Sequence, residues 1–156
     1  MKLKVYLACL ALGLSFNTLA NTRLHGVLIE PPTCEVSSGE PISVDFGEVG
    51  VNNVDGQNYI KDIPYSLSCN SSPAGFDLYL KMSGTVTTYD TAALQTDISD
   101  LGIRIFQNGN ALQINNEILI DPANPPELKA VPVKEPGSTL SAAPFSASAT
   151  LTAEFQ

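Results

Sequence analysis

The chain has 156 residues, of which 16 are acidic and 8 are basic, so its formal charge at pH 7 is −8. An acidic chain argues against nucleic acid or an anionic membrane surface as its partner. The length suits one domain once a leader is removed.

Residues 1–20 have the plan of a secretory signal peptide. Lys2 and Lys4 precede an apolar run over 5–14, and Thr18-Leu19-Ala20 fits a small-residue cleavage site. Cleavage after Ala20 leaves a single domain over 21–156, with 6 basic and 16 acidic residues and a formal charge of −10. No later stretch approaches eighteen apolar residues, so no membrane span is expected.

Two cysteines, Cys34 and Cys69, remain after this cleavage. An even pair in an exported protein predicts a disulfide. The closed loop of about 35 residues should contribute about 3–4 kcal/mol by the chain-entropy model. His25 is the single histidine, so no ligand cluster is expected and the predicted metal and cofactor content is none.

Short stretches of alternating polarity follow one another along the chain. Strands are expected at 21–29, 33–36, 42–46, 60–69, 76–82, 101–106, 113–120 and 128–133. Pro64 cannot donate to a ladder, so it should lie at a sheet edge or a strand start. Asp90 is expected to cap one helical turn over 90–96. Turns are expected at Asn108-Gly109 and at 136–138.

The run 145–155 alternates without a break and is the longest strand signal, about 35 Å at about 3.3 Å per residue. One face carries only apolar side chains: Phe145, Ala147, Ala149, Leu151, Ala153 and Phe155. Two interpretations fit it. It is an ordinary C-terminal strand covered by earlier strands, or one of its edges is left for another chain.

These short strands, with no amphipathic helix of useful length, predict an all-β sandwich. Signatures of catalysis are missing from the sequence. No nucleophile elbow accompanies His25, and there is no Gly-rich phosphate loop. Carboxylates are plentiful, but the sequence marks out no pair among them. The sequence therefore predicts a protein that is not an enzyme.

Five stretches carry a resemblance to a known family through their order and spacing. They are 26–34, where Gly26 precedes Pro32 and Cys34, and then 42–47, 63–69, 101–109 and 145–155. Together they resemble chaperone–usher fimbrial subunits, in particular the minor tip or adaptor pilins of P-type and type 1-like pili. The chain departs from the family in having Phe155 where a tyrosine is usual and Ala142-Ala143-Pro144 where a glycine is usual.

The resemblance implies an incomplete immunoglobulin-like β-sandwich that lacks its last strand. A periplasmic chaperone fills the gap first, and the N-terminal extension of a neighbouring pilin subunit then replaces it at an outer-membrane usher. It also implies export through the periplasm to a cell-surface fimbrium and a contribution to cell adhesion. The groove would be lined by Phe145, Ala147, Ala149, Leu151, Ala153 and Phe155, and Gln156 would anchor the chain on the chaperone. Thr22, Leu24 and Gly26 would form this chain's own short donor strand, within an extension over about 21–26.

Two other classes of function stay open from the sequence alone. The first is a self-contained secreted β-sandwich that binds a ligand such as a glycan. The second is an acidic hydrolase, which requires a carboxylate pair that converges in a cleft.

Overall fold

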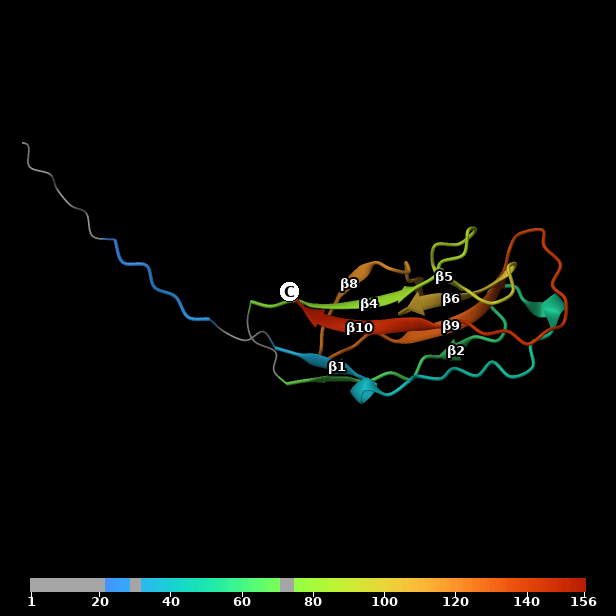
Figure 1. Cartoon of the computed structure of the whole chain (residues 1–156). Helices are drawn as coiled ribbons and strands as arrows, with labels where there is room; N and C mark the ends of the chain where they lie inside the picture. The colour runs from blue at the N-terminus through green and yellow to red at the C-terminus, as the bar shows by residue number, and fades with distance from the viewer. Residues whose placement is uncertain (1–21, 29–31, 71–74) are drawn as a thin grey trace, which may run out of the picture.

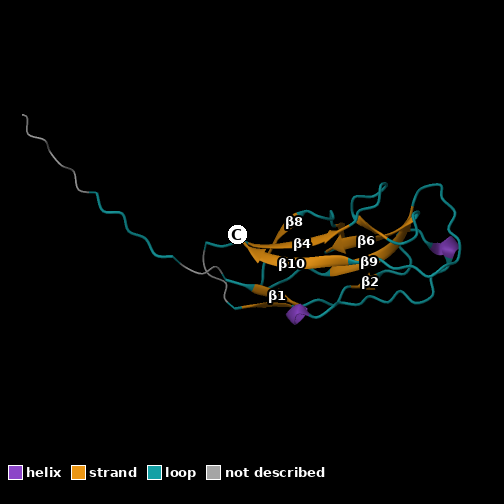
Figure 2. Ribbon diagram, viewed as in Figure 1, coloured by secondary structure: helices purple, strands orange, loops and turns teal. Residues whose placement is uncertain are grey.

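The computed structural model of the chain describes residues 22–28, 32–70 and 75–156, and the predicted signal peptide lies outside them. The described part is almost entirely strands and loops (Figure 2). Two short 3-10 turns occur, at Ser37–Gly39 and Val51–Asn53. The strands are β1 (Cys34–Val36), β2 (Lys61–Asp62), β3 (Leu67–Cys69), β4 (Leu78–Gly84), β5 (Ala93–Gln95), β6 (Leu101–Gln107), β7 (Asn110–Ala111), β8 (Glu117–Ile120), β9 (Leu128–Lys134) and β10 (Ala149–Phe155).

The described strands form three antiparallel sheets. The largest has the order β2-β9-β6-β5, with β7 paired to β6. A second sheet has the order β10-β4-β8, and β1 pairs only with β3 in a third. The sheets are layered (Figure 1), and their inner faces share one apolar core. The all-β prediction and the immunoglobulin-like sandwich are confirmed.

The core is built from strands in which every second side chain is buried. In β4, Leu78, Leu80 and Met82 are buried and alternate with half-buried residues. They pack against Ile103 and Ile105 of β6 in the facing sheet. Alternation of this kind is what an antiparallel sheet with one covered face requires.

The predicted strand over 60–69 is two strands in the structure. β2 pairs with β9 and β3 pairs with β1, so the chain changes sheet between them. Pro64 lies at this change and is exposed. Proline has no N–H to give to a ladder, so the sequence marks the point at which one pairing ends and another begins.

The helical turn predicted over 90–96 is wrong. Asp90 does cap a turn, because its carboxylate accepts a hydrogen bond from the Ala92 N–H at 2.9 Å. The chain then enters β5, where Ala93 and Leu94 are buried against β6. Tertiary packing thus overrides a local capping signal. The turn at Asn108-Gly109 is confirmed, with both residues at positive φ, 47° and 81°.

Candidate functional site

One edge of β10 is unpaired in the described structure. β10 hydrogen-bonds to β4 from Ala149↔Gly84 to Phe155↔Leu78, and β4 separates it from β8. Its other edge faces β1, which lies beside it but shares no ladder with it (Figure 1). The N–H and C=O groups along such an edge are free to pair with another strand.

The opposite wall is the segment 41–46, which runs on from β1. Ile42, Val44 and Phe46 are half-buried, while the residues between them are exposed, so the predicted alternation holds. The predicted strand does not form. Among the described residues no backbone hydrogen bond joins this segment to a neighbour. Its side chains are placed as in a strand, but its backbone has no partner.

An apolar groove lies between these two walls. A cavity of about 520 Å³ occupies its middle, next to one of about 630 Å³ toward Phe155 and one of about 460 Å³ toward Leu140. Neighbouring cavities share lining residues, which makes the groove continuous. The Phe46 and Phe145 rings, with centroids 6.1 Å apart, bridge the walls near the Leu140 end.

The apolar face predicted for 145–155 lines this groove. Ala153 is buried, and Phe145, Leu151 and Phe155 are half-buried. Ala147 and Ala149 are exposed although they line the middle cavity. Their exposure means that none of the described residues covers this part of the core.

The predicted strand over 145–155 is shortened to Ala149–Phe155. Its partner β4 ends at Gly84, and the chain beyond it pairs with β5, through Gln95 N–H to Thr85 C=O at 2.8 Å. Residues 145–148 therefore have no ladder. Asp97 holds them instead, since its carboxylate accepts from the Ser146 N–H at 2.9 Å and its own N–H donates to the Ser146 C=O at 3.1 Å.

Sequence reasoning missed the floor of the groove. Met82, Leu94, Ile103, Ile105 and Ala130 line the middle cavity from four different strands. All of these residues except Leu94 belong to predicted strands, and Leu94 falls in the predicted helical turn over 90–96. No local signal in the sequence separates core residues under a covered sheet from core residues under an open groove. Only the pairing of the strands shows which part stays uncovered.

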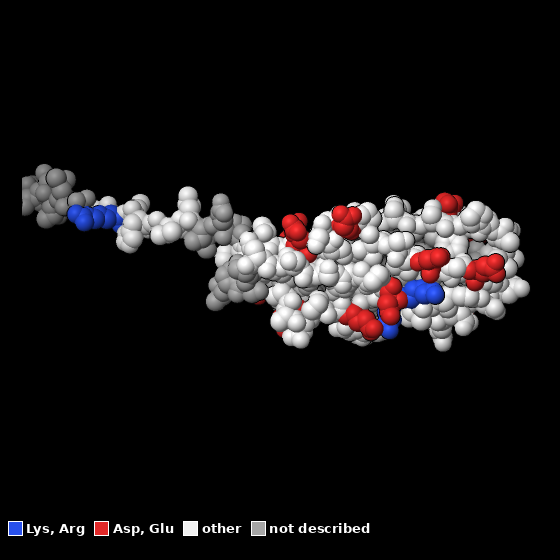
Figure 3. All heavy atoms as spheres, turned by 90° about the horizontal axis from the view of Figure 1, so that it is seen from below, with Lys and Arg blue, Asp and Glu red and all other residues white. Residues whose placement is uncertain are grey.

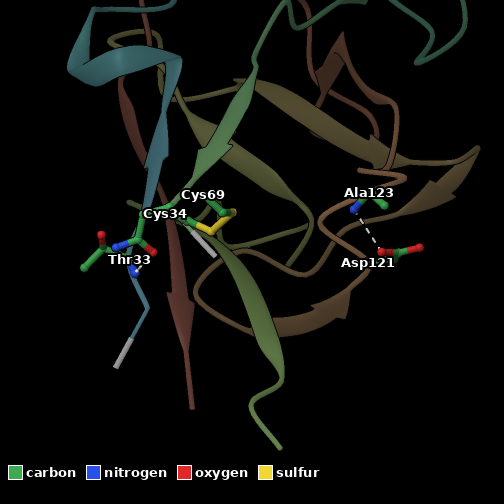
Figure 4. Close-up of a disulfide and its surroundings, with 6 residues drawn as sticks. Thr33, Cys34, Cys69, Asp121 and Ala123 are labelled. Carbon is green, nitrogen blue, oxygen red and sulfur yellow. Dashed lines mark hydrogen bonds between the residues drawn. A yellow bond between two sulfur atoms is a disulfide. The ribbon is translucent and has the colours of Figure 1, made fainter. Parts of the chain in front are cut away.

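The predicted disulfide between Cys34 and Cys69 is present (Figure 4). It joins β1 to β3 at a pair of directly opposed residues. β1 forms one wall of the groove toward Phe155, together with Pro32 and Thr33. The disulfide therefore fixes this wall to the body of the domain.

Gln156 follows the groove-lining strand β10. Its backbone exchanges two hydrogen bonds with Asp77, at 2.9 and 3.0 Å, and its side-chain amide donates to Glu117 at 3.3 Å. These contacts hold the chain end beside β4. The anchoring role of Gln156 stays a prediction.

Thr22, Leu24 and Gly26 are not brought to the groove. Residues 22–28 extend away from the body (Figure 1) and all of them are exposed, with Leu24 at 92% and Leu28 fully accessible. We call residues 22–28 the N-terminal arm. It leaves the body near the Phe155 end of the groove, since Pro32 and Thr33 line that end.

Apolar side chains form most of the lining of the middle cavity. No group of three or more His, Cys, Asp or Glu side chains suited to a metal ion occurs among the described residues. No helix in the same part of the chain is long and apolar enough to span a membrane. What the groove presents is an apolar floor between two strand-like edges, a geometry suited to an extended peptide.

Curated relatives cover nearly the whole chain. The uncharacterized fimbrial-like protein YfcQ of Escherichia coli K12 is 33% identical over 96% of both chains, and YfcR of the same organism is 38% identical over 83% of this chain and 78% of its own. The putative minor fimbrial subunit PmfE of Proteus mirabilis is 31% identical over 83% of this chain, which spans 41% of that relative.

Solved structures show the same fold. The P pilus rod subunit PapA matches over 86% of this chain and all of its own, with 20% identity and a TM-score of 0.63. The P pilus adaptor subunit PapF matches over 81% of this chain and 98% of its own, with 23% identity and a TM-score of 0.60. The family model for fimbrial proteins matches residues 23–156. The chain therefore belongs to the fimbrial protein family and is a structural pilin.

Proposed function

We propose that this pilin is completed by a donor strand from another protein, which inserts between β10 and the segment 41–46. The observation that carries the proposal is the apolar groove flanked by two strand-like edges with no ladder across it. A strand placed there would pair with both edges and cover Ala147 and Ala149.

The energetics support an external strand. A donor that buries four or five apolar side chains is worth roughly 6–15 kcal/mol at about 1.5–3 kcal/mol each. A whole domain is stable by about 5–15 kcal/mol. The domain without a donor is therefore expected to be marginally stable and prone to pairing through its open edges.

The remaining steps follow the route implied by the family resemblance. Residues 1–20 direct export and are removed, leaving the pilin domain over 21–156. A periplasmic chaperone supplies the first donor strand, with Gln156 at its anchor. At the outer-membrane usher a neighbouring subunit's extension replaces it, and the subunit enters a surface fimbrium that serves adhesion. The role is structural, with no catalytic step.

Leu151→Asp tests the groove. Leu151 is half-buried and lines two of the cavities, so the charge would face the inserted strand. Leu119→Asp on β8 is the matched control, because Leu119 is 60% exposed on the same sheet. Each variant is co-expressed in the periplasm with the cognate chaperone, and the complex is quantified after chaperone capture.

We expect Leu151→Asp to lose the chaperone complex and Leu119→Asp to keep it. Equal yield and equal melting temperature of the wild-type subunit with and without chaperone would contradict the open groove. That result would favour the alternative, a self-contained sandwich that needs no donor strand. In a self-contained sandwich, Leu151→Asp is expected to unfold the domain whether or not a partner is present.

A further inference from the structure

The open part of the groove lies along the first half of the C-terminal run. The apolar side chains of the run that line the middle cavity are Phe145, Ala147, Ala149 and Leu151. At the other end of the run, β1 lies beside β10. Residues 145–148, which have no ladder, therefore provide much of the edge that an inserted strand could reach. The way in which this segment is held decides how long that edge is.

Asp97 takes the place of a ladder partner for Ser146. A hydrogen-bonded pair in an antiparallel ladder exchanges two N–H···O=C bonds, as Gln156 and Asp77 do at the other end of the run. The Asp97 N–H likewise donates to the Ser146 C=O at 3.1 Å. The Asp97 carboxylate accepts from the Ser146 N–H at 2.9 Å, where a backbone carbonyl would do so in a ladder. The side chain thus supplies the second bond of the pair.

This pairing keeps residues 145–148 in phase with β10. Ser146 lies an even number of positions before Gln156, and each exchanges bonds with a residue beside the run. Backbone groups of alternate residues point to opposite edges of a strand. The N–H and C=O of Ala147 therefore lie on the groove edge, together with those of Ala149 and Leu151. Asp97 lengthens this edge by residues 145–148, about 13 Å at about 3.3 Å per residue.

Asp97 is the sole hydrogen-bonded support of this segment within the described part of the chain. Thr85 and Ser148 both line a polar cavity of about 380 Å³, which leaves a gap where the ladder with β4 would have continued. Acidic side chains are scattered over the face seen in Figure 3, and an exposed acid usually needs no partner. Asp97 differs because both of its carboxylate oxygens contact Ser146.

The loop that carries Asp97 is itself fixed by Gln95 of β5. The Gln95 side-chain Nε2 lies 2.9 to 3.3 Å from four backbone carbonyl oxygens, those of Thr96, Ile98, Ser99 and Leu101. The buried Thr96 hydroxyl donates to the Leu101 carbonyl at 2.8 Å and closes the loop further. The position of Asp97 is therefore set by the sheet before any donor binds.

We propose that Asp97 is a positioning residue for donor binding, which holds Ser146 as a neighbouring strand would, while Gln95 holds the loop of Asp97. This rests on the proposed donor-strand function and adds to it the residue that keeps the open end of the groove edge extended. A donor then meets an Ala147 N–H and C=O already placed for pairing, and it does not have to order residues 145–148 as it binds. Without Asp97 the usable edge begins at Ala149.

A peptide donor tests the proposal in the mature chain after chaperone release. The peptide is neutral, alternates valine and serine, and is long enough to span 145–151. Calorimetry measures its affinity, and NMR measures the exchange of single amides. In the wild type the peptide should protect the Ala147 amide. Asp97→Ala is expected to lose that protection and to weaken binding about fivefold, the net effect of one hydrogen bond. The Thr152 amide, paired with β4, should stay protected.

Two further variants separate positioning from a general effect of charge or stability. Asp97→Asn should behave as the wild type, because its Oδ1 can accept the same Ser146 N–H. Asp100→Ala is the matched control, since its carboxylate belongs to the same loop and accepts from the Ser99 hydroxyl at 3.0 Å. Wild-type affinity and Ala147 protection in Asp97→Ala would overturn the positioning role. A loss in Asp97→Asn as large as the loss in Asp97→Ala would overturn it too.

Ser146→Pro decides the matter if Asp97→Ala also loses protection at Thr152. It removes the same N–H from the other partner, so a fivefold loss supports the proposal and unchanged affinity overturns it. The proposed function has its own readout, a rise in wild-type melting temperature with the peptide that Leu151→Asp abolishes. If this rise occurs while the Asp97 variants bind as the wild type does, the groove stands and the positioning role falls. If the peptide does not stabilise the wild type, both proposals fail.

Discussion

The hydroxyl groups of Tyr65 and Tyr89 are expected to contribute differently to the stability of the sandwich. Both are half-buried, and burial raises the pKa of each to about 12, with Glu135 and Asp90 adding to the rise for Tyr89. The Tyr65 hydroxyl donates to the Pro126 carbonyl at 2.6 Å. The Tyr89 hydroxyl is buried beside Gly102 and has no hydrogen-bond partner among the described residues.

The two tyrosines should therefore respond oppositely to loss of the hydroxyl. Tyr65→Phe removes a hydrogen bond to a buried residue and is expected to lower the free energy of unfolding by about 1 kcal/mol. Tyr89→Phe removes an unsatisfied polar group and is expected to be neutral or stabilising. Urea unfolding of each variant, with the same donor bound, gives the comparison. A loss at Tyr89 as large as the loss at Tyr65 would indicate an unrecognised partner for the Tyr89 hydroxyl.

At the scale of the elements, alternation is predictable from the sequence and pairing is not. The segment 42–46 alternates in polarity as cleanly as any strand, and its side chains alternate in burial, yet it forms no ladder with any of the described residues. Residues 145–148 lack the ladder that Ala149–Phe155 form with β4, because β4 ends at Gly84. A side-chain period reports which face is apolar, whereas a hydrogen-bonded edge depends on a partner far away in the chain.

The groove face of 145–155 was predictable because one chain segment supplies it. The floor was not, because Met82, Ile103 and Ala130 come from three strands that meet only after folding. The helical turn over 90–96 failed for a related reason. The cap at Asp90 is a local interaction that can be read from the sequence. The burial of Ala93 and Leu94 against β6 depends on residues distant in the chain, and it outweighs the local preference for a helical turn.

The disulfide should matter more for the groove than for the rest of the sandwich. Cys34→Ala with Cys69→Ala removes the link between β1 and β3. The expected loss in unfolding free energy is about 3–4 kcal/mol by the chain-entropy model. Since β1 is one wall of the groove, donor binding should weaken as well. Chemical denaturation and chaperone capture measure the two effects. Unchanged capture by the destabilised variant would show that β1 holds its place without the disulfide.

Across the whole molecule, stability is expected to be uneven. β6 and β9 pair along seven residues in the middle of the largest sheet, and most of the residues in both strands are buried. The segment 41–46 and the outer edge of β10 have no backbone partners among the described residues. Regions with few backbone hydrogen bonds open most readily.

Amide hydrogen exchange should distinguish the stable strands β6 and β9 from the segment 42–46. Amides of 42–46 are expected to exchange fast in the donor-free subunit and to become protected when a donor is bound, while amides of β6 and β9 stay protected throughout. Mass spectrometry of the subunit before and after chaperone release measures both sets. Slow exchange of 42–46 in the absence of any donor would mean that the two edges already have a partner within the chain.

The unpaired edge of β10 also changes what a melting temperature means for this chain. A ligand that binds only the folded state raises stability with the logarithm of its free concentration. If the missing strand is supplied in trans, dilution alone lowers the unfolding midpoint, and no single value belongs to the isolated polypeptide. If a neighbouring subunit supplies that strand within a fibre, the strand is tethered in place, and its effective concentration is set by linkage rather than by dilution. An assembled subunit would then hold its fold under conditions in which the same sequence, free in solution, does not.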